Sequence, residues 1–137
     1  MPRARKHLVC VSETPCYHVP ARCVRRAYLC GMDRYSGKSY EHRRSWVEDC
    51  LRILSSIFSI SVCADVVMSN NYHLVVRLNP SESDQWTDEA VLDRWTSLFR
   101  GSLLVQRHQR GEALSEIELE SLKSTTSVYR RRLGSLS

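Results

Sequence analysis

The chain has 137 residues, of which 42% are hydrophobic and 8% aromatic, with 20 Lys and Arg against 15 Asp and Glu. This size and composition are typical of one globular domain and exclude a disordered or low-complexity chain. No apolar run approaches the roughly 20 residues that cross a bilayer, and the N-terminus "MPRARKHLVCVSE" lacks the apolar core of a signal peptide. We therefore expect a cytoplasmic protein with no membrane partner.

The basic residues are concentrated in the N-terminal part of the chain. Residues 1–58 hold eleven Lys and Arg against five Asp and Glu, whereas residues 59–137 hold nine against ten. Arg makes up 17 of the 20 basic residues, and its planar guanidinium suits phosphates and bases, although high Arg usage also follows from genome composition. Any nucleic-acid surface is therefore expected near the N-terminus, where residues 1–14 form a basic arm.

The cysteines predict no chemistry. The chain has six, without a CxxC pair and without the spacing of a zinc site. In a reducing compartment they are expected to be free structural thiols.

The first predicted strand covers residues 16–24, "CYHVPARCV", where apolar and polar residues alternate. Pro20 has no N–H for a sheet ladder, which favours an edge strand or a bulge. Residues 29–44, "LCGMDRYSGKSYEHRR", are polar and rich in turn formers, so they predict a loop in which basic and aromatic side chains are mixed.

A helix is predicted over residues 46–58, with Ser45 and Glu48 as a capping box at its start. Its apolar stripe contains seven side chains: Trp46, Val47, Cys50, Leu51, Leu54, Ile57 and Phe58.

Two antiparallel strands, 60–67 and 72–78, follow around the short turn "MSNN". In the first, Ile60, Val62, Ala64 and Val66 are expected on one side of the sheet. In the second, Leu74 and Val76 are expected to face the helix, while His73 shares the opposite face with Asn71.

The C-terminal part is predicted to be helical after an acidic linker, "NPSESDQW". One helix is capped by Thr87 and stopped by Gly101, with Val91, Leu92, Trp95, Leu98 and Phe99 as its apolar stripe. The last helix covers Glu116 to Leu133, with Ser115 and Glu118 as its capping box. The predicted fold class is α+β: an antiparallel sheet with helices packed on one face and the other face free for a ligand.

Asn71 and His73 are the residues that suggest a metal site. Their spacing puts one amide oxygen and one imidazole on the same face of a strand, where both can reach a divalent ion. Two ligands are too few for a tight site, and a single histidine on a strand is more often a hydrogen-bonded structural residue.

Four stretches together resemble a known family: "PCYHVPARCVRRAYLC", "KSYEHRRSWVEDCL", "VCADVVMSNNYHLVV" and "LDRWTSLFRG". They resemble the N-terminal part of the single-tyrosine HUH transposases, in particular the REP-associated tyrosine transposase branch. The resemblance implies a ferredoxin-like or RRM-like core in a partial, C-terminally truncated domain over residues 15–137, with a helical extension over about 88–133.

The resemblance also implies a degenerate catalytic site. In the family, two histidines flanking a bulky residue hold Mg²⁺ or Mn²⁺ at the scissile phosphate, and a tyrosine on a later helix attacks the DNA. His73 matches the second histidine, whereas Asn71 stands in place of the first. The tyrosine of the family lies beyond the matched region, and Tyr129 is expected to be a packing residue, so no catalytic residue is assigned and bound metal is expected to be weak or absent.

A DNA-binding surface is expected around the end of the first strand. Arg22, Arg25 and Arg26 can grip phosphates, and Tyr28 and Tyr40 can stack on unpaired bases at the foot of a hairpin. Arg43 and Arg44 add positive charge nearby. The alternative is an ordinary solvated basic loop.

The expected function is that of a transposase-like DNA-binding protein of a mobile element, related to enzymes of DNA transposition and recombination but inactive as this chain. A noncatalytic fragment that binds single-stranded or hairpin DNA, and a pseudogene product without a role, are the alternatives.

Overall fold

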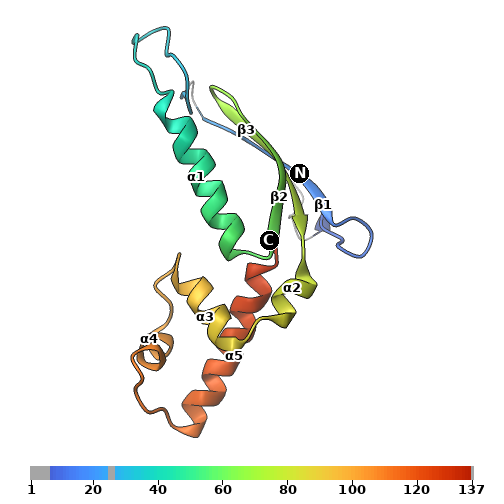
Figure 1. Cartoon of the computed structure of the whole chain (residues 1–137), viewed down its shortest axis with the longest axis vertical. Helices are drawn as coiled ribbons and strands as arrows, with labels where there is room; N and C mark the ends of the chain where they lie inside the picture. Colours follow the sequence, from blue (N-terminus) through green and yellow to red (C-terminus); the bar gives the residue numbers. More distant parts are fainter. Residues whose placement is uncertain (1–6, 25–26, 137) are drawn as a thin grey trace. The chain divides into compact units, whose positions relative to one another are not determined.

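The computed structural model describes residues 7–24 and 27–136 (Figure 1). Within these ranges the chain is α+β, as predicted, with one three-stranded antiparallel sheet and five α-helices. In chain order the elements are β1 (Cys16–Arg22), α1 (His42–Ile57), β2 (Ile60–Val67), β3 (Asn71–Leu78), α2 (Pro80–Gln85), α3 (Asp88–Thr96), α4 (Leu103–Gln109) and α5 (Glu116–Leu133).

These elements belong to two compact units. The sheet unit consists of residues 10–56 and 60–78, and holds the sheet and nearly all of α1. The helical unit consists of residues 57–59 and 79–136, together with 7–9, and holds α2 to α5.

The sheet has the strand order β1-β3-β2, with both pairs antiparallel. The predicted pairing of 60–67 with 72–78 is confirmed, although β3 begins one residue earlier, at Asn71. β1 ends at Arg22 rather than at residue 24 and occupies an edge, where Pro20 lies opposite His73. The edge position suits Pro20, which cannot donate a backbone hydrogen bond.

The two faces of β3 differ as the alternation predicts. Leu74 and Val76 are buried, whereas Val75 is exposed and His73 is half-buried on the other face. The expected alternation of β2 is wrong beyond Val62, because a bulge shifts the register between Val62 and Ala64. A bulge adds one unpaired residue and so turns the following side chains to the opposite face.

Helix α1 begins at His42, four residues before the predicted start. Ser45 lies inside its first turn and donates its hydroxyl to the carbonyl of His42 at 2.9 Å, so the predicted capping box at Ser45 is wrong. Arg43 and Arg44 consequently belong to this helix and not to the preceding loop.

The helix lies beside the predicted face of the sheet but leaves a cleft there. This cleft, of about 640 Å³, has polar and apolar walls formed by Glu48, Leu51, Arg52, Ser55, Ser56, Val62 and Asp65. Val62 pairs with Val76, so the cleft opens on the face that carries Val76. The predicted apolar stripe of α1 is only partly buried, with Trp46 63% exposed and Cys50 also exposed.

The helical unit corrects two predictions for the C-terminal part. The expected linker after β3 contains α2, and α4 was not predicted. Thr87 caps α3 as expected, with its Oγ1 accepting from the N–H of Ala90 at 3.2 Å. This helix ends at Thr96, so Leu98 and Phe99 lie beyond it and are exposed.

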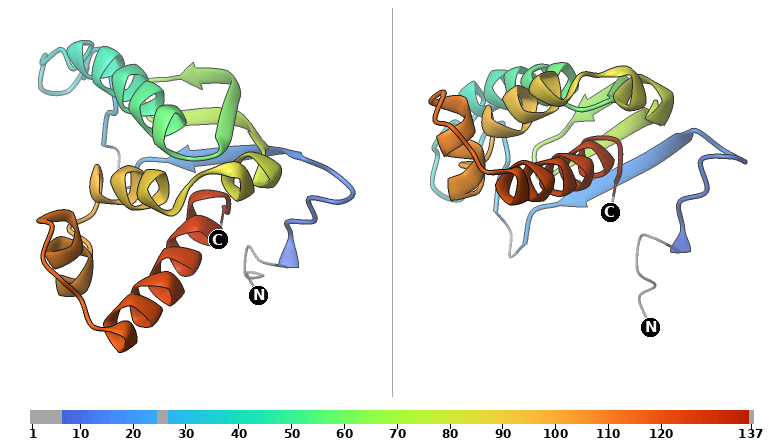
Figure 2. Two further views of the ribbon diagram at one scale, coloured as in Figure 1. Left: turned by 60° about the horizontal axis from the view of Figure 1, so that its bottom comes forward. Right: turned by 90° about the horizontal axis from the view of Figure 1, so that it is seen from below.

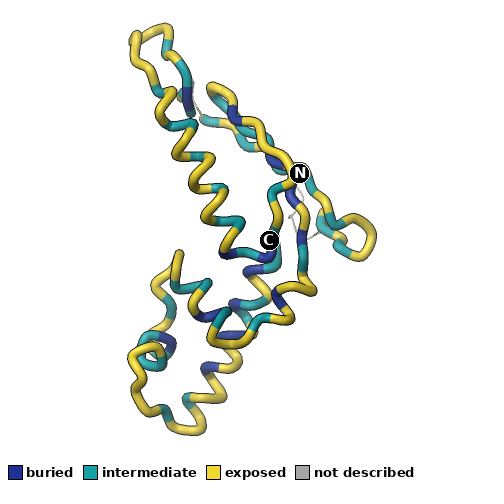
Figure 3. Tube along the Cα trace, in the orientation of Figure 1, coloured by how far each residue is buried: buried dark blue, intermediate teal, exposed yellow. Residues whose placement is uncertain are grey.

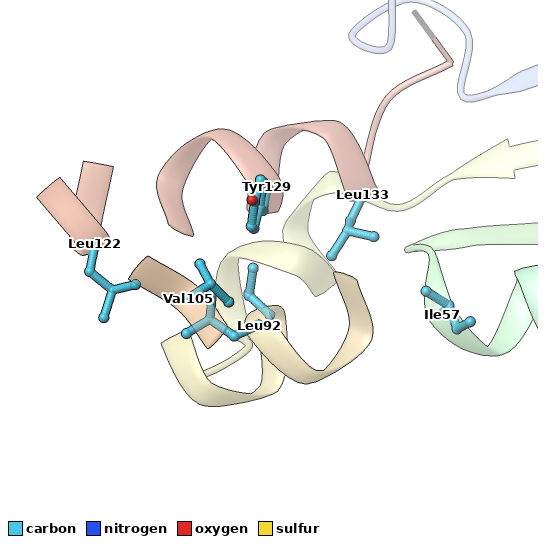
Figure 4. Packing of buried hydrophobic residues seen from close by; sticks show 7 residues of the cluster. Ile57, Leu92, Val105, Leu122, Tyr129 and Leu133 are labelled. Atoms are coloured by element: carbon cyan, nitrogen blue, oxygen red, sulfur yellow. The ribbon is translucent and has the colours of Figure 1, made fainter. Parts of the chain in front are cut away.

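The core of the helical unit is built from α3, α4, α5 and the end of α1 (Figures 3 and 4). Its buried members are Ile57, Val91, Leu92, Val105, Leu122, Tyr129 and Leu133. The ring of Tyr129 stacks on Trp95 with the ring centroids 4.2 Å apart and the planes 9° apart. The packing role predicted for Tyr129 therefore agrees with its surroundings.

The predicted capping box of α5 is confirmed. The hydroxyl of Ser115 accepts from the N–H of Glu118, and the Glu118 carboxylate accepts from the N–H of Ser115 at 2.9 Å. Arg107 of α4 also donates to this carboxylate, at 2.6 Å. The N–H of Ser115 and then the guanidinium of Arg107 lower the pKa of Glu118, because both favour its ionised form.

A test follows from the pH dependence of this cap. Because the folded-state pKa of Glu118 is depressed, its stabilising effect is complete above the ordinary carboxyl pKa of about 4.3 and is lost as the pH falls through the folded-state value. We expect the free energy of unfolding to fall less steeply below about pH 4.3 in Glu118→Gln than in the parent. Urea unfolding from pH 7 to 3 measures this, with Glu120→Gln, an exposed carboxyl of α5, as the control. If the free energy of unfolding falls equally steeply with decreasing pH in the parent and in Glu118→Gln, the Glu118 carboxylate does not stabilise this cap.

Candidate nucleic-acid interface and histidine pair

The turn between β2 and β3 is bonded to the segment that follows β1. Ser69 accepts backbone hydrogen bonds from Leu29 at 2.6 Å and from Cys30 at 3.3 Å, and Asn70 accepts one from Cys23 at 2.8 Å. The fully buried Cys30 adds its thiol, which donates to the carbonyl of Met68 at 3.2 Å. Two segments that are distant in the sequence are thereby held side by side. Figure 2 shows the ribbons of the chain from two further directions.

The predicted loop before α1 has internal order. Met32 and Ser39 form an isolated antiparallel bridge, and Asp33 accepts from the hydroxyl of Ser36 at 2.6 Å and from the N–H of Tyr35 at 2.9 Å. The hydrogen bond from Ser36, and then the one from Tyr35, lower the pKa of Asp33, because both favour its ionised form. The tip of this loop presents Tyr35, which is 87% exposed.

Arg43 and Arg44 hold the first turn of α1 in place. The guanidinium of Arg43 lies 4.2 Å from the ring centroid of Tyr40 and donates to the carbonyl of Tyr28 at 3.3 Å. Arg44 donates to Glu41 at 2.6 Å and to the carbonyl of Val67. The hydrogen bond from Arg44 lowers the pKa of Glu41. Both arginines thus have protein partners, which limits how freely they can reach a phosphate.

A small pocket lies where these segments meet. It has a volume of about 270 Å³ and is lined by Arg22, Cys23, Ala27, Tyr28, Tyr35, Ser69 and Asn70. Two of the predicted DNA-binding residues, Arg22 and Tyr28, are therefore brought to one site. Arg43 adjoins it through its hydrogen bond to the carbonyl of Tyr28, and the ring of Tyr40 lies against the guanidinium of Arg43. Arg25 and Arg26 lie outside the described residues.

The sequence prediction missed the other five residues that line this pocket, among them Tyr35, Ser69 and Asn70. These three lie in turns, at "DRYSGK" and "MSNN", and the turn residues themselves were the available signal. What the sequence did not indicate was that the two turns share one site.

His73 lies on the open face of the sheet, as predicted, but its nearest polar partner comes from β1. Its Nδ1 is 2.9 Å from the Nε2 of His18, and the two ring planes are 9° apart. His18 was not singled out from the sequence. His18 lies two residues from Pro20, and Pro20 lies opposite His73. The proximity of the two histidines can therefore be recognised only once the register of the edge strand is known.

Asn71 keeps its predicted position at the start of β3 and faces Arg22 across the strand pair. Its Oδ1 is buried and has no hydrogen-bond partner among the described residues. In residues 7–24 and 27–136, no three His, Cys, Asp or Glu side chains gather in a way that could hold a metal ion. Asn71 and His73 supply one amide oxygen and one imidazole, a donor set that fits Mg²⁺ or Mn²⁺ poorly.

Comparisons with protein-family models, with curated proteins and with solved structures give no match for this chain. Across the residues that the structure describes, no helix has both the length and the apolar character needed to span a bilayer.

Proposed function

We propose that this chain is a transposase-like DNA-binding protein of the REP-associated tyrosine transposase type, with a ferredoxin-like or RRM-like sheet unit. In this proposal it binds single-stranded DNA or the foot of a DNA hairpin. The four sequence stretches quoted above suggest the family. The observation that supports binding is the pocket in which Arg22 and Tyr28 meet.

The chemistry of this pocket suits one unpaired base with its phosphate. Its volume of about 270 Å³ is near the lower limit for ligand sites, so it fits one small planar group and not a folded ligand. The ring of Tyr28 offers a stacking surface, and the exposed Arg22 offers a charge to the phosphate. Ser69 and Asn70 add a hydroxyl and an amide that can bond the edge of a base.

The proposal is binding without strand cleavage. Cleavage in the resembled family needs a divalent ion and a tyrosine nucleophile, and here Asn71 replaces one of the histidine ligands. Tyr129 is packed against Trp95 in the core of the helical unit, so its hydroxyl is poorly placed for attack on DNA. Any Mg²⁺ or Mn²⁺ at Asn71 and His73 is expected to bind weakly.

Fluorescence anisotropy tests the proposal directly. We expect tighter binding to a hairpin with an unpaired foot than to a blunt duplex of the same length, because only unpaired bases can enter the pocket. Affinity should fall linearly with salt on a logarithmic scale, since phosphate contacts release counterions. Arg25→Ala combined with Arg26→Ala should weaken binding and reduce the salt slope by up to about one for each phosphate that these arginines neutralise.

Lys123→Ala, an exposed cation on α5, is the charge control for that double variant. Equal affinity for the hairpin and the blunt duplex would show that unpaired bases are not recognised. If the salt slope of the double variant equals that of the parent, Arg25 and Arg26 make no phosphate contact. The segment that carries them is then an ordinary solvated basic loop.

A further inference from the structure

We propose that the cleft between α1 and β2 binds a linear aliphatic polyamine, with spermidine as the reference case. Such a ligand carries ammonium groups that are joined by methylene chains. The cleft lies entirely within the sheet unit, and its volume of about 640 Å³ is in the usual range for small-ligand sites. The proposal does not rest on the proposed DNA binding, because the cleft shares no residue with the pocket lined by Arg22 and Tyr28.

Two carboxylates line the cleft, one from the helix and one from the strand. Glu48 belongs to α1 and Asp65 to β2, and both residues are exposed. Neither carboxylate forms a hydrogen bond or an ion pair with another of the described residues. Both negative charges are therefore available to a cationic ligand that lies in the cleft.

The arginines closest to these carboxylates already have anionic partners. Arg52, which also lines the cleft, donates to Asp49 at 2.8 Å. Arg44 lies one helical turn before Glu48, but its side chain donates to Glu41 at 2.6 Å. Each arginine is thus balanced by a carboxylate outside the cleft, and the cleft carboxylates give it a net negative charge.

The hydroxyl groups of the cleft favour a ligand that donates hydrogen bonds. Ser56 donates its hydroxyl to the carbonyl of Ile53 at 2.6 Å, and Ser55 donates to that of Ile60 at a longer 3.5 Å. A hydroxyl whose hydrogen is engaged in this way offers its oxygen lone pairs to a ligand. Ammonium groups donate hydrogen bonds and accept none, so they match these oxygens and the carboxylates, whereas phosphate and carboxylate ligands do not.

The apolar residues of the cleft suit the methylene chains between the ammonium groups. Leu51 of α1 and Val62 of β2 both line the cleft and are half-buried. Contact with methylene groups removes more of their apolar surface from water, a gain that a hydrated metal ion cannot supply. We therefore expect the cleft to bind spermidine in preference to Mg²⁺.

Isothermal titration calorimetry on the full chain is the first test. Spermidine, MgCl₂ and 1,4-butanediol are titrated at one ionic strength, and the diol has a methylene chain without charge. We expect saturable binding of spermidine, and binding of the other two that is weaker by at least about tenfold. Equal affinity for spermidine and Mg²⁺ would show a general attraction of cations to acidic side chains and would overturn the proposal.

Charge-removing variants locate the site. Glu48→Gln and Asp65→Asn keep the size of the side chain, and each should weaken spermidine binding by about fivefold, the upper range for one exposed ion pair. Glu13→Gln removes an exposed carboxylate of the sheet unit that does not line the cleft, so this control should bind like the parent. A double variant of Glu48 and Asp65 with the parent's affinity would place the ligand elsewhere and contradict the proposal.

Amide ¹H–¹⁵N spectra of the unsubstituted chain give an independent measurement. We expect spermidine to shift the signals of residues 48–56 and 62–65 and to leave those of Glu13 and Glu120 unchanged. Shifts spread evenly over the acidic residues of the chain would exclude a specific site in the cleft. Because these spectra need no substitution, a variant that fails to fold does not leave the question open.

Discussion

Leu92→Ala is expected to lower the free energy of unfolding of the helical unit by about 2–5 kcal/mol. Leu92 is 1% exposed and belongs to the cluster that joins α3, α4 and α5, so its truncation removes apolar contacts and leaves a cavity. Urea unfolding followed by tryptophan fluorescence measures this decrease. A Trp46→Phe background is used, because the two remaining indoles, Trp86 and Trp95, then both report on the helical unit.

Ile117→Ala is the matched control for this change. Ile117 is an apolar residue of α5 that is 82% exposed, so we expect its truncation to change the free energy of unfolding by no more than about 0.5 kcal/mol. If the two variants were equally stable, the assignment of the core to this cluster would be wrong.

The second large effect is expected at the pocket of the sheet unit. Tyr28→Ala should weaken binding of a hairpin with an unpaired foot by about 1–3 kcal/mol, or roughly 5- to 150-fold, because it removes the stacking surface for one base. Arg22→Ala should weaken binding and also reduce the salt slope by about one, since it removes one phosphate contact. Fluorescence anisotropy at several salt concentrations separates these two effects.

Two controls make this experiment specific to the pocket. Tyr28→Phe keeps the ring and should keep most of the affinity, because stacking does not need the hydroxyl. Arg77→Ala removes an exposed arginine of the same sheet that lies opposite Cys16, at the other end of the β1–β3 pair from Arg22. If Arg77→Ala reduced the salt slope as much as Arg22→Ala, binding would be a property of the whole open face and not of the pocket.

The pocket also depends on residues that do not line it. Leu29 and Cys30 hold the β2–β3 turn against the segment that carries Tyr28, through hydrogen bonds to the carbonyls of Ser69 and Met68. Gly31, which follows Cys30, has a φ of +84°, in the region that residues with a Cβ rarely adopt. The sequence "LCG" is therefore a structural requirement of this site, although none of its residues lines the pocket.

The sequence alone determined the elements whose signals are local. The capping box at Ser115 and Glu118 gave the start of α5, and period-two alternation around "MSNN" gave the pairing of β2 with β3. The same alternation correctly separated the buried Leu74 and Val76 from the face that carries His73. Each of these features depends on residues a few positions apart, so periodicity and capping chemistry are enough to predict it.

Only the tertiary structure decided the features that depend on distant partners. Helix α1 starts at His42, because Arg43 and Arg44 find hydrogen-bond acceptors in Tyr28 and Val67, and a capping pattern at Ser45 cannot reveal those partners. The bulge after Val62 puts the later side chains of β2 on the opposite face from the one that the alternation predicts, since one added residue reverses the alternation.

The same reason explains the two sites. His18 and His73 are 55 positions apart in the chain, and only the register of an edge strand puts their nitrogens in contact. The pocket likewise joins the end of β1 to a turn more than forty residues later. Side-chain chemistry and local period could be read from the sequence, whereas the meeting of these residues required long-range strand pairing, which local patterns do not encode.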